Sequence, residues 1–249
     1  MLRRPRATLQ YVTRLDPDLL LRAYSVGVFP MADSRAAGEV YWVEPKARGI
    51  LPLSGFRLSR SLAKVLRSER YVTTVDHDFT GVVAGCAAAT ATRPDTWINP
   101  QIEQAYAELF ARGHAHSIEA WRDGQLVGGL YGVTLGAAFF GESMFSRATD
   151  ASKVALAHLV ARLRVGCFKL LDCQFITSHL ASLGAIEVSQ AAYVELLDSA
   201  LGVGSSGVSA FGDFLALDRL PPPDPPPPAT TVSGPTSGWR IAQLLGQTS

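Results

Sequence analysis

The sequence has little net charge, few cysteines and no long apolar run. Its 249 residues carry 23 Lys and Arg against 22 Asp and Glu, a formal net charge of +1. Any nucleic-acid contact must therefore come from a local basic patch. No apolar run approaches the roughly 20 residues of a membrane-spanning helix, and the basic residues 1–10 are not followed by the apolar core of a signal peptide. Since 47% hydrophobic residues suffice for a packed core, we expect a globular, cytoplasmic protein.

Cysteine and histidine give no sign of a metal or disulfide framework. Cys86, Cys167 and Cys173 lack both the paired spacing of a metal site and the pattern of a disulfide scaffold. All three lie among apolar neighbours, so the sequence predicts reduced, buried thiols. His114 and His116 would share one face of a strand, as metal ligands do, but no neighbouring acid or cysteine completes a shell. We predict no bound metal and no cofactor.

The order of the predicted elements indicates an α+β fold. Prolines 17 and 100 stand at helix starts, and Asp123-Gly124 is typical of a tight hairpin. Helices are predicted over residues 17–26, 59–70, 79–89, 100–112, 151–165, 178–183 and 193–201, and strands over 41–42, 49–53, 116–121, 126–133, 137–144, 170–174 and 185–188. Three antiparallel strands thus precede a helix and a further strand, a layout similar to the N-acetyltransferase fold.

This layout suggests three segments. Residues 1–90 are predicted to form a small N-terminal α/β domain, and residues 91–205 a larger catalytic domain with a mixed sheet. Residues 206–249 form a Pro-rich extension, which we expect to be largely disordered because it lacks apolar periodicity before residue 239. Whether the last apolar segment, 239–245, docks on the protein is left open.

Two acids stand where apolar segments end. The run 137–140 leads to Glu142, and the pair 170–171 leads to Asp172. Acids at the ends of buried segments are often functional. Because alternate side chains of a strand share a face, Asp172 and Gln174 are predicted to point into one space.

Several short sequence motifs occur along the chain in a specific order. They are FFGESMFSR (139–147), ASK (151–153), DCQ (172–174) and HLASLGA (179–185), preceded by AYSVGVFP (23–30), YW (41–42), WIN (97–99) and GHAHSIE (113–119). Together they closely resemble the leucyl/phenylalanyl-tRNA–protein transferase family. The resemblance covers roughly residues 15–197.

The resemblance implies an aminoacyltransferase. Such an enzyme moves Leu, Phe or, less well, Met from its tRNA ester to the N-terminal Lys or Arg of an acceptor protein. The product carries a degradation signal of the N-end rule type. The implied partners are aminoacyl-tRNA and acceptor proteins, without DNA, a membrane or a cofactor.

The resemblance also implies roles for individual residues. Asp172 would hold or deprotonate the attacking ammonium, Gln174 would orient the ester or amine, and Glu142 would contact the substrates. The implied substrate-binding residues are Leu130, Gly141, Met144, Leu156, Leu159 and Leu171 around the amino acid, and Trp42, Trp97 and Phe139 near the terminal adenosine. Strict alternation places residue 171 on the face away from residue 172, so either this strand is bulged or one assignment fails.

Two other functions fit parts of the sequence. An acyl-CoA-dependent N-acetyltransferase needs backbone N–H groups at a helix start around the pyrophosphate; residues 125–130 imitate that signature but lie in a predicted strand. A non-catalytic RNA-binding protein would interleave aromatic and basic residues on exposed strands, whereas the aromatics here lie in apolar strands or single loops. The densest basic face is formed by Arg60, Lys64, Arg67 and Arg70, and it is either a solvated surface or a phosphate contact.

Overall fold

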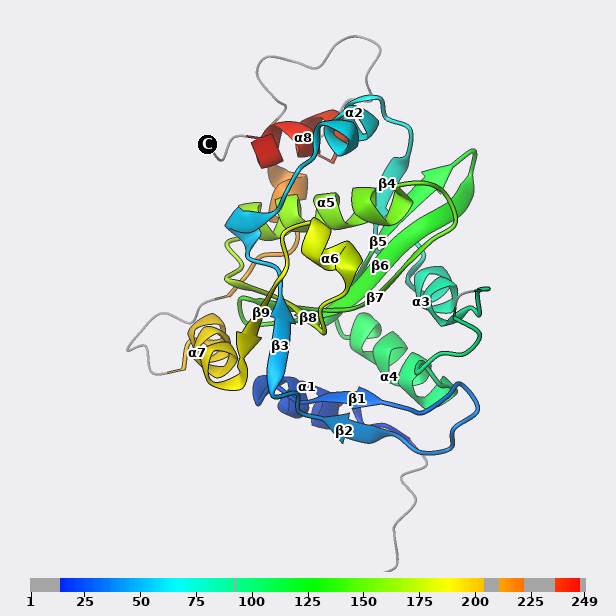
Figure 1. The fold of residues 1–249 in the computed structure, drawn as a ribbon, viewed down its shortest axis with the longest axis vertical. Coiled ribbons are helices and arrows are strands. Elements are labelled where there is room, and N and C mark those ends of the chain that lie inside the picture. Colours follow the sequence, from blue (N-terminus) through cyan, green and yellow to red (C-terminus); the bar gives the residue numbers. More distant parts are fainter. Residues whose placement is uncertain (1–13, 92, 204–210, 222–235, 247–249) are drawn as a thin grey trace, which may run out of the picture.

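The computed structural model describes residues 14–91, 93–203, 211–221 and 236–246, which form two sheets and the helices that cover them (Figure 1). The helices are α1 (Pro17–Ser25), η1 (Leu53–Gly55), α2 (Arg60–Arg67), α3 (Phe79–Ala87), α4 (Pro100–Ala111), α5 (Ala151–Val165), α6 (Ser178–Ser182), α7 (Gln190–Leu201), η2 (Ala216–Arg219) and α8 (Gly238–Gly246). The strands are β1 (Phe29–Met31), β2 (Tyr41–Val43), β3 (Ala47–Ile50), β4 (Val72–Val75), β5 (Ala115–Arg122), β6 (Gln125–Leu135), β7 (Ala138–Ser146), β8 (Leu170–Gln174) and β9 (Ile186–Ser189).

The larger sheet is mixed. Its strand order is β4-β5-β6-β7-β8-β3-β9, and the smaller sheet pairs β1 with β2. Strands β5, β6 and β7 form the predicted antiparallel meander, and β7 pairs with β8 in parallel through the crossover helix α5. The predicted α+β class with a mixed sheet is therefore confirmed.

Helices cover both faces of this sheet. Helix α5 crosses one face and is itself covered by α2 and α8, while α3, α4 and α7 lie against the other side (Figure 1). Because α5 is enclosed by the sheet on one side and by helices on the other, apolar residues occur all around it. Two cores result, one containing Leu156 and Leu171 and the other containing Tyr106 and Phe140.

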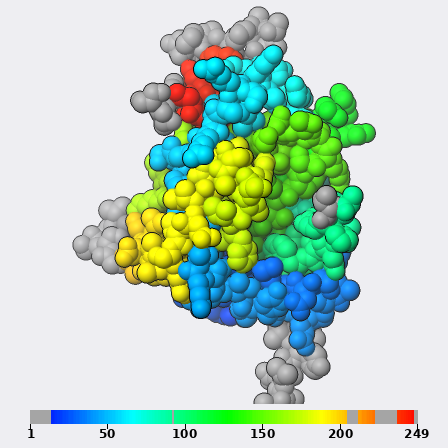
Figure 2. Space-filling model, in the orientation of Figure 1, coloured from blue at the N-terminus to red at the C-terminus, as the bar shows by residue number. Residues whose placement is uncertain are grey.

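The N-terminal segment contributes to both sheets. Helix α1 and the β1-β2 pair lie together, whereas β3 and β4 join the seven-stranded sheet. Figure 2 shows the N-terminal segment in blue, lying against the rest of the molecule on this face. Strand β1 contains Pro30, which pairs with Trp42 of β2. Its proline is tolerated because a two-stranded sheet leaves one edge of each strand without ladder bonds.

The last apolar segment docks as helix α8. The Glu69 carboxylate accepts from the backbone N–H groups of Gly238 (3.1 Å) and Trp239 (3.0 Å), which satisfies donors at the helix start. Ile241 and Leu245 are buried against α5 and α2. Residues 238–246 thus form a docked helix, which answers the question left open for the last apolar segment. The proline run 222–235 lies outside the described residues, so the expected disorder of the extension stays a prediction.

Two of the three cysteines and His116 differ from their predicted surroundings. Cys86 is buried as predicted, but Cys167 is exposed on a left-handed backbone (φ 58°) and Cys173 is half-buried. His116 Nδ1 lies 2.7 Å from the Asp76 carboxylate.

In the described part of the chain, no helix has both the length and the apolar character needed to cross a membrane.

Candidate functional site

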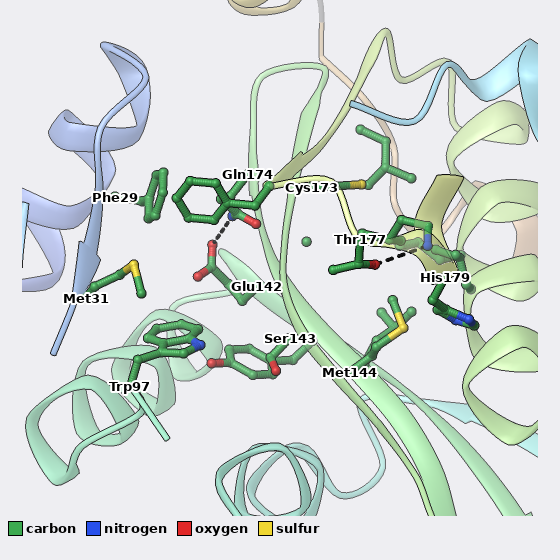
Figure 3. A pocket seen from close by; sticks show the side chains of 18 residues that line it. Phe29, Met31, Trp97, Glu142, Ser143, Met144, Cys173, Gln174, Thr177 and His179 are labelled. Atoms are coloured by element: carbon green, nitrogen blue, oxygen red, sulfur yellow. Dashed lines mark hydrogen bonds between the residues drawn. The ribbon is translucent and has the colours of Figure 1, made fainter. Parts of the chain in front are cut away.

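A cavity opens where two parallel strands part. Strands β7 and β8 pair from Ala138 with Leu170 to Phe140 with Asp172, and beyond these residues they diverge. A cavity of about 290 Å³ lies there, which is large enough for an amino-acid side chain and its ester. Its lining comprises Phe29, Met31, Trp97, Leu130, Tyr131, Gly141, Glu142, Ser143, Met144, Leu156, Leu159, Leu171, Cys173, Gln174, Phe175, Thr177, His179 and Leu180 (Figure 3).

A bulge in β7 directs Glu142 into this cavity. The β6-β7 register passes from Tyr131 opposite Ser143 to Gly132 opposite Gly141, so Glu142 is the extra residue. Bulges often redirect a side chain beside an active site. Glu142 thus lines the cavity, and its functional role stays a prediction.

The Glu142 carboxylate is held by three donors. Tyr24 Oη and Tyr106 Oη each donate to it at 2.7 Å, and Gln174 Nε2 donates at 3.1 Å. The two tyrosine oxygens also lie within hydrogen-bond distance of each other. Burial raises the pKa of Glu142 to about 7, although the tyrosine hydrogen bonds lower it in part. Near neutral pH this carboxylate is therefore suited to accept and release a proton.

A second bulge brings Gln174 to the same place. Gly49 pairs with Gln174 and Ile50 with Asp172, so Cys173 is the extra residue in β8, and Gln174 has a left-handed backbone (φ 54°). The simple alternation predicted for residues 172 and 174 is wrong because of this turn. Gln174 points toward Glu142 (Figure 3), and because its amide nitrogen donates there, the amide oxygen is left to accept from a substrate.

Asp172 does not line the cavity. It is fully buried, and it accepts from Arg48 Nε (2.9 and 3.1 Å) and from Arg48 Nη2 (2.6 Å). It also accepts from Tyr193 Oη and from the Gln174 backbone N–H, both at 2.8 Å. The prediction that Asp172 and Gln174 point into one space is therefore corrected. Asp172 instead fixes the backbone of Gln174 from behind the strand.

Sequence reasoning missed Arg48, the partner of Asp172. The Arg48 side chain is 1% exposed and lies between the rings of Phe29 (4.6 Å) and Tyr193 (4.5 Å). Burial by itself would lower the pKa of Arg48, but the hydrogen bonds and charge of Asp172 raise it above its ordinary value. An arginine in a short polar run gives no local sign of such burial, since charged residues are usually exposed.

Most of the predicted substrate-binding residues do line the cavity. Its apolar part is formed by Leu130, Met144, Leu156, Leu159 and Leu171, the residues predicted around the amino acid. Gly141 and Trp97 line it as well. Leu171 reaches the cavity and Asp172 faces away by ordinary strand alternation, so of the two possibilities left open it is the substrate-facing assignment of Asp172 that fails.

Phe139 and Trp42 lie elsewhere. Phe139 is fully buried and stacks on Phe214, with ring centroids 5.6 Å apart, because it belongs to the paired part of β7 before the strands diverge. Trp42 is 39% exposed on β2 and does not line the cavity. Neither supports the predicted contact with adenosine in this structure. Phe29 and Phe175, which the sequence did not single out, lie at the cavity instead, with ring centroids 5.7 Å apart.

The alternative functions find little support in the geometry. Residues 125–130 lie within β6, so their backbone N–H groups belong to a sheet and not to a helix start. A GCN5-related N-acetyltransferase-like protein from Streptococcus suis is 16% identical to this chain, with a TM-score of 0.29 over 68% of this chain and 65% of that chain. A likeness of this size does not establish a shared fold.

Comparison with known sequences gives a much stronger match. A protein of Rhizorhabdus wittichii named leucyl/phenylalanyl-tRNA–protein transferase is 67% identical over 94% of this chain and 99% of its own. A protein of the same name from Zymomonas mobilis is 61% identical over 84% of this chain and 77% of its own.

The family profiles cover both parts of the chain. The profile of the leucyl/phenylalanyl-tRNA protein transferase N-terminal domain matches residues 13–46, and that of leucyl/phenylalanyl-tRNA protein transferase matches residues 50–198. The first match supports a separate N-terminal domain, whereas the boundary expected at residue 90 stays a prediction. The chain belongs to the leucyl/phenylalanyl-tRNA protein transferase family of enzymes.

Proposed function

We propose that this enzyme transfers leucyl and phenylalanyl groups, and methionyl groups less well, from tRNA to proteins that begin with Lys or Arg. The product is a protein with an N-terminal degradation signal. One observation carries the proposal: a single cavity joins an apolar end to a carboxylate and an amide that suit an attacking amine.

The apolar end suits a long, uncharged amino-acid side chain. Leucines and a methionine form its wall, and Met144, Thr177 and His179 lie together at this side of the cavity (Figure 3). Trp97, Met31 and Phe29 lie at the opposite side. An aminoacyl ester bound across the cavity would place its side chain among the leucines and its terminal adenosine among the aromatic residues, since bases stack on aromatic rings. The ester carbon then lies between them, beside Glu142 and Gln174.

The reaction needs a proton acceptor and good positioning. The neutral α-amine attacks the ester carbon, a C–N bond forms, and the C–O bond to the ribose breaks. The amine proton passes to the Glu142 carboxylate, and a proton returns to the ribose oxygen. An α-amine has a pKa of about 7.7–8.0, close to that of Glu142, so proton transfer is nearly balanced. Gln174 orients the amine through its free amide oxygen, and Asp172 holds Gln174 in place.

A direct transfer assay tests the function. The enzyme is incubated with [¹⁴C]Phe-tRNA and a peptide that begins with Arg, and the peptide mass is measured. We expect an increase by one phenylalanyl residue. A matched peptide with an acetylated N-terminus should gain nothing, because it has no α-amine. Absence of transfer to the free peptide contradicts the proposal.

The cavity predicts discrimination against β-branched amino acids. Val and Ile crowd the ester carbon, whereas Leu, Met and Phe branch farther from it, and a mismatched methylene is worth only about 1–3 kcal/mol. We therefore expect kcat/KM for Leu-tRNA to exceed that for Ile-tRNA by roughly 10- to 200-fold. Competition between the two charged tRNAs measures this ratio, and equal rates would exclude this pocket as the determinant of specificity.

The basic face of α2 predicts salt-dependent tRNA binding. Arg60, Lys64, Arg67 and Arg70 are all exposed, and each phosphate that they neutralise should contribute about 0.7–0.9 to the slope of log affinity against log salt. Replacing all four with Gln should reduce this slope by about 3. Filter binding from low to high salt measures it, with Arg122→Gln on the β5-β6 hairpin as the control. An unchanged slope in the quadruple variant would place the tRNA elsewhere.

A further inference from the structure

Tyr131 presents a buried hydroxyl without a partner. Its side chain is fully buried and lines the cavity, and its ring makes edge contacts with Phe79 (5.9 Å between centroids) and Tyr106 (5.4 Å). Tyr131 Oη has no hydrogen-bond partner among the residues that the structure describes. The neighbouring hydroxyls of Tyr24 and Tyr106 both donate to Glu142.

An unsatisfied buried hydroxyl is unfavourable. It costs about 1–3 kcal/mol when no hydrogen-bond partner replaces water. Phenylalanine would fill the same space without that cost. The presence of the hydroxyl is therefore explained if a substrate supplies its hydrogen-bond acceptor. Burial, and after it the charge of Glu142, raises the pKa of Tyr131 well above its ordinary value. The hydroxyl therefore stays protonated and requires an acceptor.

The position of Tyr131 identifies the acceptor. On β6 it follows Leu130, which lines the apolar end, and it pairs with Ser143, the neighbour of Glu142. The side chain of Tyr131 lies on the Tyr106 side of the strand and that of Leu130 on the Leu156 side, and both line the cavity that Glu142 enters. An ester bound across this cavity therefore passes the Tyr131 side chain. Glu142 already accepts from three side chains, and the proposed function uses its remaining acceptor site for the amine, so Glu142 does not serve as the partner of Tyr131.

We propose that the Tyr131 hydroxyl donates a hydrogen bond to the carbonyl oxygen of the aminoacyl ester. The inference rests on the proposed function, because it takes the ester as the ligand. As the amine adds to the ester carbon, this oxygen gains negative charge and the hydrogen bond strengthens. A donor placed at that position accelerates the reaction more than it tightens substrate binding.

Tyr131→Phe tests the proposal, because it removes only the hydroxyl. We expect kcat for transfer to fall by roughly 10²-fold, as when one donor to a developing oxyanion is lost, with a small change in KM for tRNA. The melting temperature should stay equal or rise, since an unpartnered polar group disappears. Tyr71→Phe is the matched control. Its hydroxyl donates to the Thr149 carbonyl (2.6 Å) outside the cavity, so its loss should lower stability and leave kcat unchanged. An unchanged kcat in Tyr131→Phe overturns the proposal.

A spectroscopic measurement separates this proposal from the proposed function. Phenylalanine methyl ester labelled with ¹³C at the carbonyl is bound to the wild-type protein and to Tyr131→Phe, and its carbonyl stretch is recorded. A lower frequency in the wild type supports the hydrogen bond, even if no transfer to peptides is found. Equal frequencies, or no binding of the ester to the wild type, overturn it. If Tyr131→Phe does not fold, the more acidic 3-fluorotyrosine is incorporated at this position instead. Its stronger hydrogen bond should lower the carbonyl stretching frequency below that of the wild type. An unchanged frequency counts against the hydrogen bond.

Discussion

Replacing Glu142 with Gln is expected to lower kcat for transfer by roughly 10²–10⁴, the usual contribution of a positioned general base. The variant keeps the size of the side chain and can still accept from a tyrosine hydroxyl, but it cannot take the proton of the amine. The structure supports the role because Glu142 faces the cavity and has a pKa of about 7. Single-turnover transfer to saturating peptide measures the effect.

The transfer rate should depend on pH through the ionisation of Glu142. Glu142 must be ionised to accept a proton, and its pKa is raised to about 7 in the folded protein. The wild-type rate should therefore fall as the pH drops below about 7. In Glu142→Gln this step should vanish, leaving the titration of the amine itself near 7.7–8.0. A wild-type profile without a step near 7 would argue against Glu142 as the acceptor.

Two further variants control this prediction. Glu119 is also fully buried, and its carboxylate accepts from Thr74 Oγ1 (2.6 Å) away from the cavity, so Glu119→Gln should keep the wild-type pH profile. Gln174→Glu places a second carboxylate within hydrogen-bond distance of Glu142. Repulsion between like charges should raise the pKa of Glu142 and move the profile to higher pH. An unmoved profile in this variant would show that the two side chains do not act together.

The fold was predictable where local periodicity reports burial. The alternating pattern and the Asp123-Gly124 turn locate the β5-β6-β7 meander, and the spacing of apolar residues locates α5. Strand β4 was missed because a short run such as Val72–Val75 has too little pattern of its own. Its pairing with β5 decides its structure.

The site was predictable as a set of residues but not as a geometry. Glu142 and Gln174 do meet, yet a bulge and a left-handed residue bring them together, and strand alternation does not foresee either feature. Tyr24 and Tyr106 could be assigned to buried helix faces, but the meeting of their hydroxyls at Glu142 depends on how α1 and α4 pack. Contacts between segments that are distant in the sequence decide both the meeting of Glu142 with Gln174 and the position of the two tyrosine hydroxyls.

Breaking the buried pair of Arg48 and Asp172 is expected to have the largest effect on stability. Both side chains are almost entirely inaccessible, and Arg48 also donates to the Gly27 carbonyl at 2.8 Å. Arg48→Met leaves Asp172 as an uncompensated buried charge, which should lower the free energy of unfolding by about 3–5 kcal/mol. Urea denaturation measures the change. The double variant Arg48→Met/Asp172→Asn should lose less than the sum of the single variants, because neither charge is then left unpaired.

Asp172→Asn also distinguishes a positioning role from a chemical one. The carboxylate fixes the Gln174 backbone in its left-handed conformation, which costs a non-glycine residue about 1–3 kcal/mol. A weaker hydrogen bond from the Gln174 backbone N–H to residue 172 should let Gln174 move away from Glu142. The value of kcat/KM for the peptide should then fall. The step near pH 7 should stay, because Glu142 still accepts the proton. The assay is run at a temperature where the variant is folded by circular dichroism. If Asp172→Asn instead removed the step near pH 7 and Glu142→Gln kept it, Asp172 would be the proton acceptor, and the cavity would have to rearrange when the substrates bind.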